Sequence, residues 1–287
     1  MQIVVEQLLN ALQIGVLLFL ISSGLSLIFG LMHVVNLAHG ALYMLGAYFA
    51  LTVVRHVGFT AALVIAPILT AVVGAVMERL LLRRTYGRGM HPQVLLTFGL
   101  VFCLDELVRI IWTPQIQTLE LPAALSGTLA VAGVTVSTYR SVVVAVGAAV
   151  TVALVLLFNR TRLGAQVRAS VDDPEMSAAL GIDVRRLFTI LFALGAALAG
   201  LGGALAVPIF NAFPGMGNEI LISALVVVVV GGMGSLTGAL LASLLVGLAM
   251  VFGQVFVAEF ATAAIYVVLI VVLLVRPQGL MGVGRPA

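Results

Sequence analysis

The sequence predicts an all-α polytopic membrane protein. Of its 287 residues, 62% are hydrophobic and 9% are charged, and the mean hydropathy is +1.25. A soluble domain carries roughly 25% charged residues, so most of this chain must lie in lipid. Because a membrane-spanning helix needs about 20 apolar residues, the length accommodates about eight or nine helices. Residues 1–287 are therefore expected to form one transmembrane domain without a separate soluble catalytic domain.

Nine apolar runs mark the expected helices. They cover residues 8–32, 41–54, 60–82, 93–112, 141–158, 186–209, 219–230, 236–252 and 257–275. The second and seventh runs are short, which suits broken or re-entrant helices better than simple spans. The first run lacks a basic leader and a cleavage signature, so we expect it to stay as a helix.

The arginines predict the orientation. Most of them lie in or beside the loops 83–92 and 159–185 and in the tail, which contains Arg276 and Arg285. Cytoplasmic loops of membrane proteins carry an excess of basic residues. We therefore expect these three segments in the cytoplasm, the N-terminus outside and the C-terminus inside. The remaining arginines, which fit this pattern poorly, are Arg55, Arg109 and Arg140.

Residue types that are missing from the sequence exclude several function classes. All 14 basic residues are arginine, so a Walker A loop and Schiff-base chemistry, which both need lysine, are excluded. HExxH, GxSxG and ligand-spaced Cys/His clusters do not occur. We therefore expect no catalytic residue, no metal and no cofactor in this chain. The net charge is only +3, and the chain has no basic soluble face, which argues against nucleic-acid binding.

A long loop, residues 113–140, is expected on the outer side. Its prolines and glycines are typical of turns, and the β-branched stretch from Thr128 to Thr138 predicts a short hairpin around Gly133. Such a loop would cover the outer mouth of the helix bundle.

A polar segment, Asn36-Leu37-Ala38-His39-Gly40, interrupts the first apolar stretch. Irregular backbone at membrane depth must be shielded by protein or water, so this segment either caps two helices or lines a path. Gly231 to Ser235 also lies between two apolar runs, which predicts a weak parallel internal repeat. By residue type we take as candidate path residues Ser22, Ser23, Ser26, Asn36, His39 and Tyr43.

The loop 159–185 encodes a short helix from Pro174 to Leu180. Asp173 suits the N-cap, Glu175 suits the positive end of the helix dipole, and Gly181 suits the position after the C-cap. A helix this short is stable only when it docks on a partner. The alternative is an ordinary connecting loop. The apolar contact of the docking helix would come from Ala178, Ala179 and Leu180.

Small residues recur at helical spacing in the last third of the chain. Gly195, Gly200 and Gly203 lie on neighbouring stripes of one helix, and Gly234 and Gly238 repeat the spacing. Such faces let helices pack closely. A different feature, the charged pair Asp105 and Arg109, has the spacing of a helical ion pair, and it either supports the structure or lines the path.

Several segments, taken together, resemble the LivH-type permeases of branched-chain amino acid ABC importers. In order from Gly24 to Gly282 they read GLSLIFG, NLAHGALYMLGAY, TRLGAQVRAS, AALGID, FALGAALAGLGGAL, VVVVGGMGSLTGAL and RPQGLMG. The resemblance implies the pore subunit of an importer in a bacterial inner membrane. It also implies a second, LivM-like permease, two ATPase subunits that carry ATP and Mg, and a periplasmic substrate-binding protein.

In this family the segment that corresponds to Gly164–Gly181 engages an ATPase, which makes Arg168 a further candidate contact. Family members also carry urea, short amides or aromatic acids, and Ala41 stands where the family usually has an acidic residue, which loosens the substrate assignment. The rival class is a secondary transporter that works alone. It would require ion-coupling carboxylates at the midplane or an inverted repeat.

Overall fold

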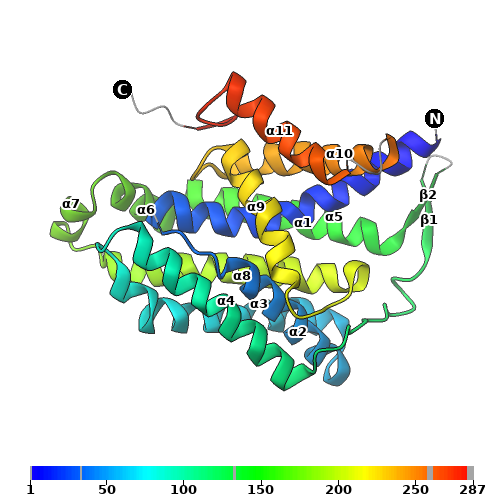
Figure 1. Ribbon diagram of the computed structural model, residues 1–287, viewed down its shortest axis with the longest axis horizontal. Helices are drawn as coiled ribbons and strands as arrows, with labels where there is room; N and C mark the ends of the chain where they lie inside the picture. Colours follow the sequence, from blue (N-terminus) through cyan, green and yellow to red (C-terminus); the bar gives the residue numbers. More distant parts are fainter. Residues whose placement is uncertain (1, 33, 132–133, 257–260, 283–287) are drawn as a thin grey trace.

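The molecule is a bundle of long helices (Figure 1). The computed structural model describes residues 2–32, 34–131, 134–256 and 261–282. Its elements are α1 (Gln2–Met32), α2 (His39–His56), α3 (Phe59–Leu80), the 3-10 helix η1 (Leu82–Thr85), α4 (Met90–Trp112), β1 (Thr128–Val131), β2 (Val134–Ser137), α5 (Thr138–Arg160), α6 (Arg162–Asp172), α7 (Pro174–Ala179), α8 (Val184–Phe210), α9 (Met216–Gly231), α10 (Leu236–Phe256) and α11 (Ala261–Val275).

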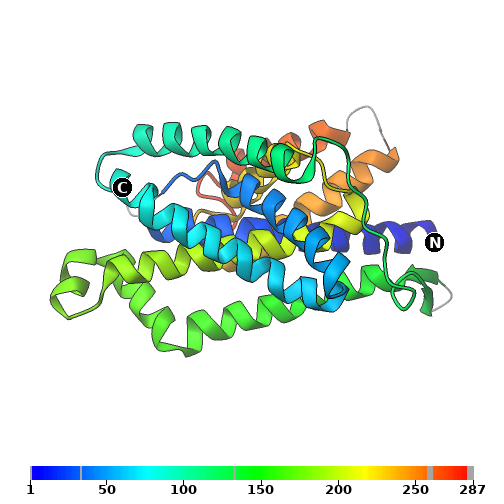
Figure 2. The same cartoon turned by 90° about the horizontal axis from the view of Figure 1, so that it is seen from below.

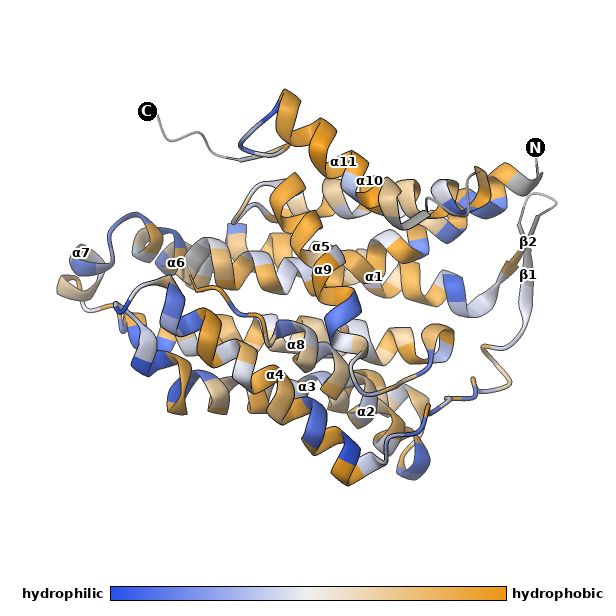
Figure 3. Cartoon of the chain, viewed as in Figure 1, coloured by the Kyte–Doolittle hydropathy of each residue, from blue (hydrophilic) through white to orange (hydrophobic). Residues whose placement is uncertain are grey.

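The polytopic architecture is confirmed by length and composition. Among the described residues, five segments are long and apolar enough to cross a bilayer, namely 4–30, 59–85, 138–160, 184–210 and 236–256. Hydrophobic residues dominate the middle of the helices in Figure 3, while hydrophilic residues gather toward the ends of the bundle. α9 has only 16 residues, so the short seventh apolar run forms a short helix.

Helix α8 lies at the centre of the bundle and packs against α1, α2 and α3. Glycines allow this packing because their backbones meet those of the neighbouring helices. A Cβ on Gly46 of α2 would overlap the backbone of Gly200, and a Cβ on Gly24 of α1 would overlap that of Gly195. Gly203, which like Gly195 and Gly200 belongs to α8, lies against the carbonyl of Tyr43 of α2. The helices therefore approach to backbone contact, and small-residue faces replace interlocking side chains.

The chain is irregular at two places between helices, of which the first is largely buried. After α1 it turns back into the bundle as a non-helical segment, in which Val34, Asn36 and Ala38 are buried, before α2 begins (Figure 1). Between α9 and α10, Gly232 and Gly234 adopt positive φ angles of 95° and 83°. Gly234 lies directly against Gly30, and Gly238 against Gly231. The internal repeat that these two segments led us to expect stays a prediction.

The arginine-rich connections share one end of the bundle. In Figures 1 and 2, α6, α7, the link from α3 to α4 and residues 276–282 after α11 lie toward one end, while the N-terminal end of α1 and the strands β1 and β2 lie at the other. Arg285 lies outside the described residues. The expected hairpin is confirmed, since β1 pairs antiparallel with β2 from Thr128↔Ser137 to Val131↔Val134. Gly133 at its turn also lies outside the described residues.

Backbone contact at α8 generates a stability prediction. Gly200→Leu should destabilise the protein by about 1–3 kcal/mol or more, because the new side chain forces α8 away from α2 and α3. Gly99→Leu is the matched control, since a side chain at Gly99 of α4 meets open space. Thermal unfolding of the purified proteins in detergent measures the difference. Equal midpoints for the two variants would contradict the packing.

Candidate functional site

Cavities follow the seam between α1 and α9, which pack against each other. The outer one, with a volume of about 350 Å³, lies between the N-terminal half of α1 and the start of α9. It is largely apolar, and its wall residues are Ile14, Leu17, Leu18, Tyr43, Phe210, Ile220, Ser223, Met250, Gln254 and Ile265. Six helices contribute to this wall, so the cavity belongs to the bundle as a whole.

One hydrogen bond bridges the seam in its middle, where the Ser22 hydroxyl of α1 donates to the carbonyl of Ala224 of α9 at 3.4 Å. Next to Ser22 along α1, the carbonyl of Ile21 accepts from the His39 Nε2 atom of α2 at 3.0 Å. Beyond these contacts lies a narrow apolar pocket of about 60 Å³ that Asn36 helps to line. This pocket shares Phe29 and Val35 with a cavity of about 470 Å³ at the arginine-rich end. Open spaces on both sides of a closed contact make the seam a candidate path.

Four of the six candidate path residues touch this seam or a cavity beside it. Tyr43 forms part of the outer cavity wall, and Asn36 lines the narrow pocket. Ser22 bridges α1 and α9, and His39 of α2 bonds to the neighbouring Ile21 of α1. The other two, Ser23 and Ser26, are buried in α1, where the Ser23 hydroxyl donates to the carbonyl of Leu20 at 3.0 Å. Whether these residues meet a solute is not tested by their positions, and the assignment stays a prediction.

Buried polar atoms remain without partners beside the break before α2. Within the described part of the chain, the Ser26 hydroxyl, both amide atoms of Asn36 and the His39 Nδ1 atom have no hydrogen-bond partner. Each such atom costs about 1–3 kcal/mol when buried. Folded proteins rarely retain several of them together, so this break is a candidate for a site where the contacts change.

The loop 159–185 folds into two helices, where we expected one. α6 begins at Thr161, whose hydroxyl accepts from the backbone N–H of Gly164 at 3.4 Å. It folds back on the end of α5, because Gly164 lies against the backbone of Phe158 and the Arg168 guanidinium donates to the Phe158 carbonyl. Thr161 followed by an amphipathic stretch was the sequence signal for α6.

The second helix, α7, has defined caps at both ends. The Asp173 carboxylate accepts from the backbone N–H of Met176 at 2.8 Å, as an N-cap does. Gly181 has a φ of 87°, and the N–H groups of Gly181 and Ile182 donate to the carbonyls of Ala178 and Ser177, both at 3.0 Å. These bonds form a Schellman motif. The helix ends at Ala179, with Leu180 as C-cap, one residue earlier than expected.

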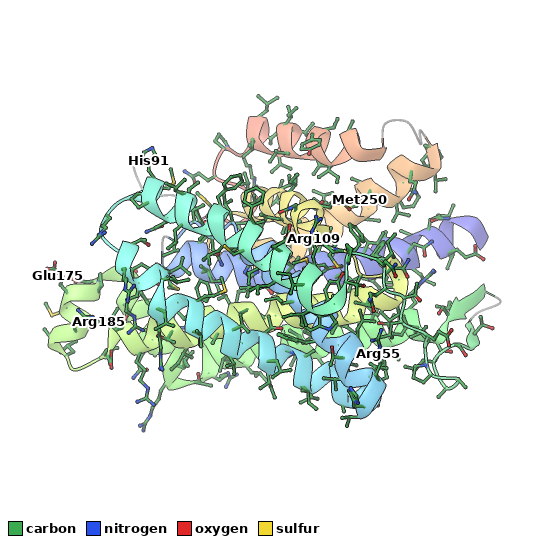
Figure 4. The ribbon with its side chains drawn as sticks, turned by 60° about the horizontal axis from the view of Figure 1, so that its bottom comes forward. Arg55, His91, Arg109, Glu175, Arg185 and Met250 are labelled. Atoms are coloured by element: carbon green, nitrogen blue, oxygen red, sulfur yellow. The ribbon has the colours of Figure 1, made fainter. Side chains whose placement is uncertain are left out.

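The tip of this loop presents apolar side chains to solvent. Met176 is 57% exposed and Leu180 is 76% exposed, and Ala178 and Ala179 are exposed beside them. Glu175 lies at the same extreme end of the molecule (Figure 4). We missed Met176 in the sequence because its side chain could equally have packed inward. An exposed apolar tip on a well-capped helix is suited to docking on another protein.

A charge network around the buried carboxylate of Glu78 links the end of α3 to α8. Glu78, at the end of α3, has no exposed surface, and its carboxylate accepts from the Arg83 guanidinium at 3.0 and 3.2 Å. It also accepts from the Thr189 hydroxyl of α8 at 2.7 Å and from the Tyr86 hydroxyl at 3.2 Å. Burial beside Glu78 raises the pKa of Tyr86 well above its usual range, so its hydroxyl stays a donor. The network ties α3 and η1 to α8 shortly after α7.

The sequence drew attention to a different charged pair, which we expected either to form an ion pair or to line the path; the ion pair is not formed, and the second alternative stays a prediction. Among the described residues, Arg83–Glu78 is the only salt bridge, and Asp105 and Arg109 do not pair. Arg109 is exposed near the end of α4, where an ion pair returns too little energy to immobilise two side chains. An acid at the end of an apolar run with an arginine five residues later was the signal for the real pair.

Residues 7–275 match the family described as the branched-chain amino acid transport system / permease component. The chain belongs to this permease family. It is 30% identical over 294 residues to the high-affinity branched-chain amino acid transport system permease protein BraD of Pseudomonas aeruginosa, a match that covers 96% of this chain and 95% of that protein.

Two further relatives of the permease are LivH proteins. It is 26% identical to the LivH permease protein of Escherichia coli K12, over 96% of this chain and 95% of that protein. It is 28% identical to a probable LivH permease protein of Methanocaldococcus jannaschii, over 93% of this chain and 89% of that protein. No solved structure matches the chain.

The charge network generates a second prediction. Glu78→Gln should lower the free energy of unfolding of the permease by at least about 1.5–3 kcal/mol, the magnitude of one hydrogen bond to a charged group. Glu106→Gln, an exposed change of the same chemistry on α4, should have little effect. Thermal unfolding measures both variants. If both unfold at the wild-type temperature, the network does not hold α8 in place.

Proposed function

We propose that this permease is the pore subunit of an ATP-driven importer for branched-chain or other hydrophobic amino acids. Membership of the permease family over residues 7–275 is the observation that carries the proposal. The relatives are named as branched-chain amino acid transport proteins, and the outer cavity beside Tyr43 is apolar, as an aliphatic side chain requires. The unpaired polar atoms of Ser26, Asn36 and His39 can accompany a polar solute through the seam.

The proposed importer contains further subunits. A second, LivM-like permease completes the pore, two ATP-binding subunits hold ATP and Mg, and a periplasmic protein delivers the substrate. This chain itself catalyses no reaction and carries no cofactor. A sequence without lysine cannot supply a Walker A loop, which is why we place ATP hydrolysis on other chains.

Coupling to the ATPase is proposed to run through α7 into α8. α7 is capped at both ends and exposes Met176 and Leu180. Directly after it, Asp183 caps α8 by accepting from the N–H of Arg186 at 2.9 Å, and Thr189 joins α8 to Glu78. Since α8 packs on α1, α2 and α3, a movement of the docked tip reaches the helices that line the seam.

The stand-alone secondary transporter is the less favoured alternative. It needs an acidic side chain in the path that can exchange a proton or cation. The fully buried acid in the described part of the chain, Glu78, is engaged by Arg83, Tyr86 and Thr189 at one end of the bundle. That position suits structural support rather than ion coupling.

The proposed orientation places the arginine-rich end in the cytoplasm of a bacterial inner membrane, following the basic-residue rule. In a Cys103→Ala background, Thr118→Cys should react with an impermeant maleimide added to intact cells, because Thr118 is exposed in the loop 113–140. His91→Cys, exposed in the arginine-rich segment 83–92, should react only after the membrane is opened. Labelling of His91→Cys from outside would reverse the orientation.

The docking tip generates the decisive test of coupling. Ala178→Arg or Ala179→Asp should abolish substrate-stimulated ATP hydrolysis and uptake in the reconstituted importer, because a charge at the exposed tip opposes an apolar contact. The chain should still fold, since both side chains are exposed. Ala123→Asp, an exposed change in the loop 113–140, is the control and should keep both activities.

If both tip variants retain full stimulation and uptake, α7 is not the coupling element. Competition of uptake with urea, short amides and aromatic acids identifies the solute, because these are the other substrates that the resemblance allows.

A further inference from the structure

A polar cavity adjoins the apolar outer cavity at the end of the bundle that carries the N-terminus of α1. Its volume is about 180 Å³, and its polar wall consists of Gln7, Asn10, Gln13, Arg140 and Gln254. Ile14, Leu17, Phe210 and Gln254 line both cavities, so the two spaces are neighbours. Figure 3 shows the hydrophilic colouring at the N-terminal part of α1 and at the start of α5. The neighbouring cavities thus offer one polar and one apolar compartment.

Arg140 provides the positive charge of the polar compartment. It lies in the first turn of α5, and its Nε atom donates to the Gln13 side-chain oxygen at 3.0 Å. Within the described residues, its two terminal nitrogens have no hydrogen-bond acceptor. The bond that Arg140 donates to Gln13 fixes the plane of the guanidinium. A fixed guanidinium with free terminal N–H groups is suited to a carboxylate, which it binds through two parallel hydrogen bonds.

The rest of the wall can satisfy the other parts of an amino acid. Asn10 and Gln13 share one face of α1, and the side-chain oxygen of Asn10 can accept from an ammonium. Glu6 lies one turn earlier on the same face, outside the cavity wall. The apolar compartment, at about 350 Å³, falls in the range of roughly 300–1,000 Å³ typical of small-molecule sites. Its wall residues Leu17, Ile220 and Met250 suit an aliphatic side chain.

We propose that these two cavities form an outer binding site for a zwitterionic amino acid with an apolar side chain. The Arg140 guanidinium binds the α-carboxylate, and the apolar compartment takes the side chain. The proposal rests on the proposed import function and adds to it a solute site within the permease, separate from any selection by a binding protein. The proposal also gives a role to Arg140, which lies at the end of the bundle where the basic-residue rule expects few arginines.

The test measures occupancy of the cavity without transport. Ser223, in the wall of the apolar compartment, is changed to cysteine in a Cys103→Ala background. Membrane vesicles that contain the assembled transporter, without binding protein, are then treated with a maleimide. Leucine at millimolar concentration should slow the labelling several-fold. Leucinamide, which keeps the side chain and the ammonium but lacks the carboxylate, should protect much less.

Variants of the arginine assign the carboxylate contact. Arg140→Gln should raise the leucine concentration for half-protection about tenfold or more, and Arg140→Lys should give a smaller increase, because lysine keeps the charge without the planar fork. Arg55→Gln is the matched control: Arg55 donates to Gln117 at 2.7 Å, away from both cavities. Its half-protection concentration should equal that of the parent protein.

Two outcomes would overturn the site. Equal protection by leucine and leucinamide in the parent protein would show that the carboxylate is not recognised, and this comparison needs no variant at Arg140. Absence of protection by leucine would show that the cavity does not bind the solute. Either result leaves ATP-driven uptake, measured separately in proteoliposomes, to judge the import function by itself.

Discussion

Direct contact between helix backbones is the constraint on which this structure depends. In a bilayer, the hydrophobic effect does not draw apolar helices together, so association requires close packing and local polar contacts. α8 meets this requirement with Gly195, Gly200 and Gly203, which bring α1 and α2 to backbone distance. The position of the α1–α9 seam, and of the cavities along it, follows from where these contacts hold the helices.

The second constraint is the satisfaction of polar groups at membrane depth. The chain breaks its helical pattern between α1 and α2 in a buried place, where every unpaired group has a cost. His39 satisfies one carbonyl of α1, yet the amide of Asn36 keeps its bonding capacity unused. The carboxylate of Glu78, by contrast, accepts hydrogen bonds from Arg83, Tyr86 and Thr189. The first region is suited to change its contacts, and the second is suited to stay fixed.

The sequence predicted the helical membrane architecture, the hairpin and the caps of α7, because each follows from local chemistry. Composition determines burial in lipid, and Asp173 and Gly181 specify helix ends through their own side chain or φ angle. Long-range pairings could not be predicted in this way. Arg83 meets Thr189 across more than one hundred residues, and Gly46 faces Gly200 only because three helices pack around α8. Asp105 and Arg109 of α4 have the spacing of an ion pair but do not form one, because helical spacing permits an ion pair without requiring it.

The exposed tip of α7 also bears on the life of the chain before assembly. Met176 and Leu180 stand in water as long as no other protein covers them. An apolar surface of this kind binds chaperones and exposes a chain to proteolysis. If another subunit covers this tip, as proposed, a copy without that subunit would keep the apolar surface exposed, and the abundance of the permease would depend on the supply of its partner.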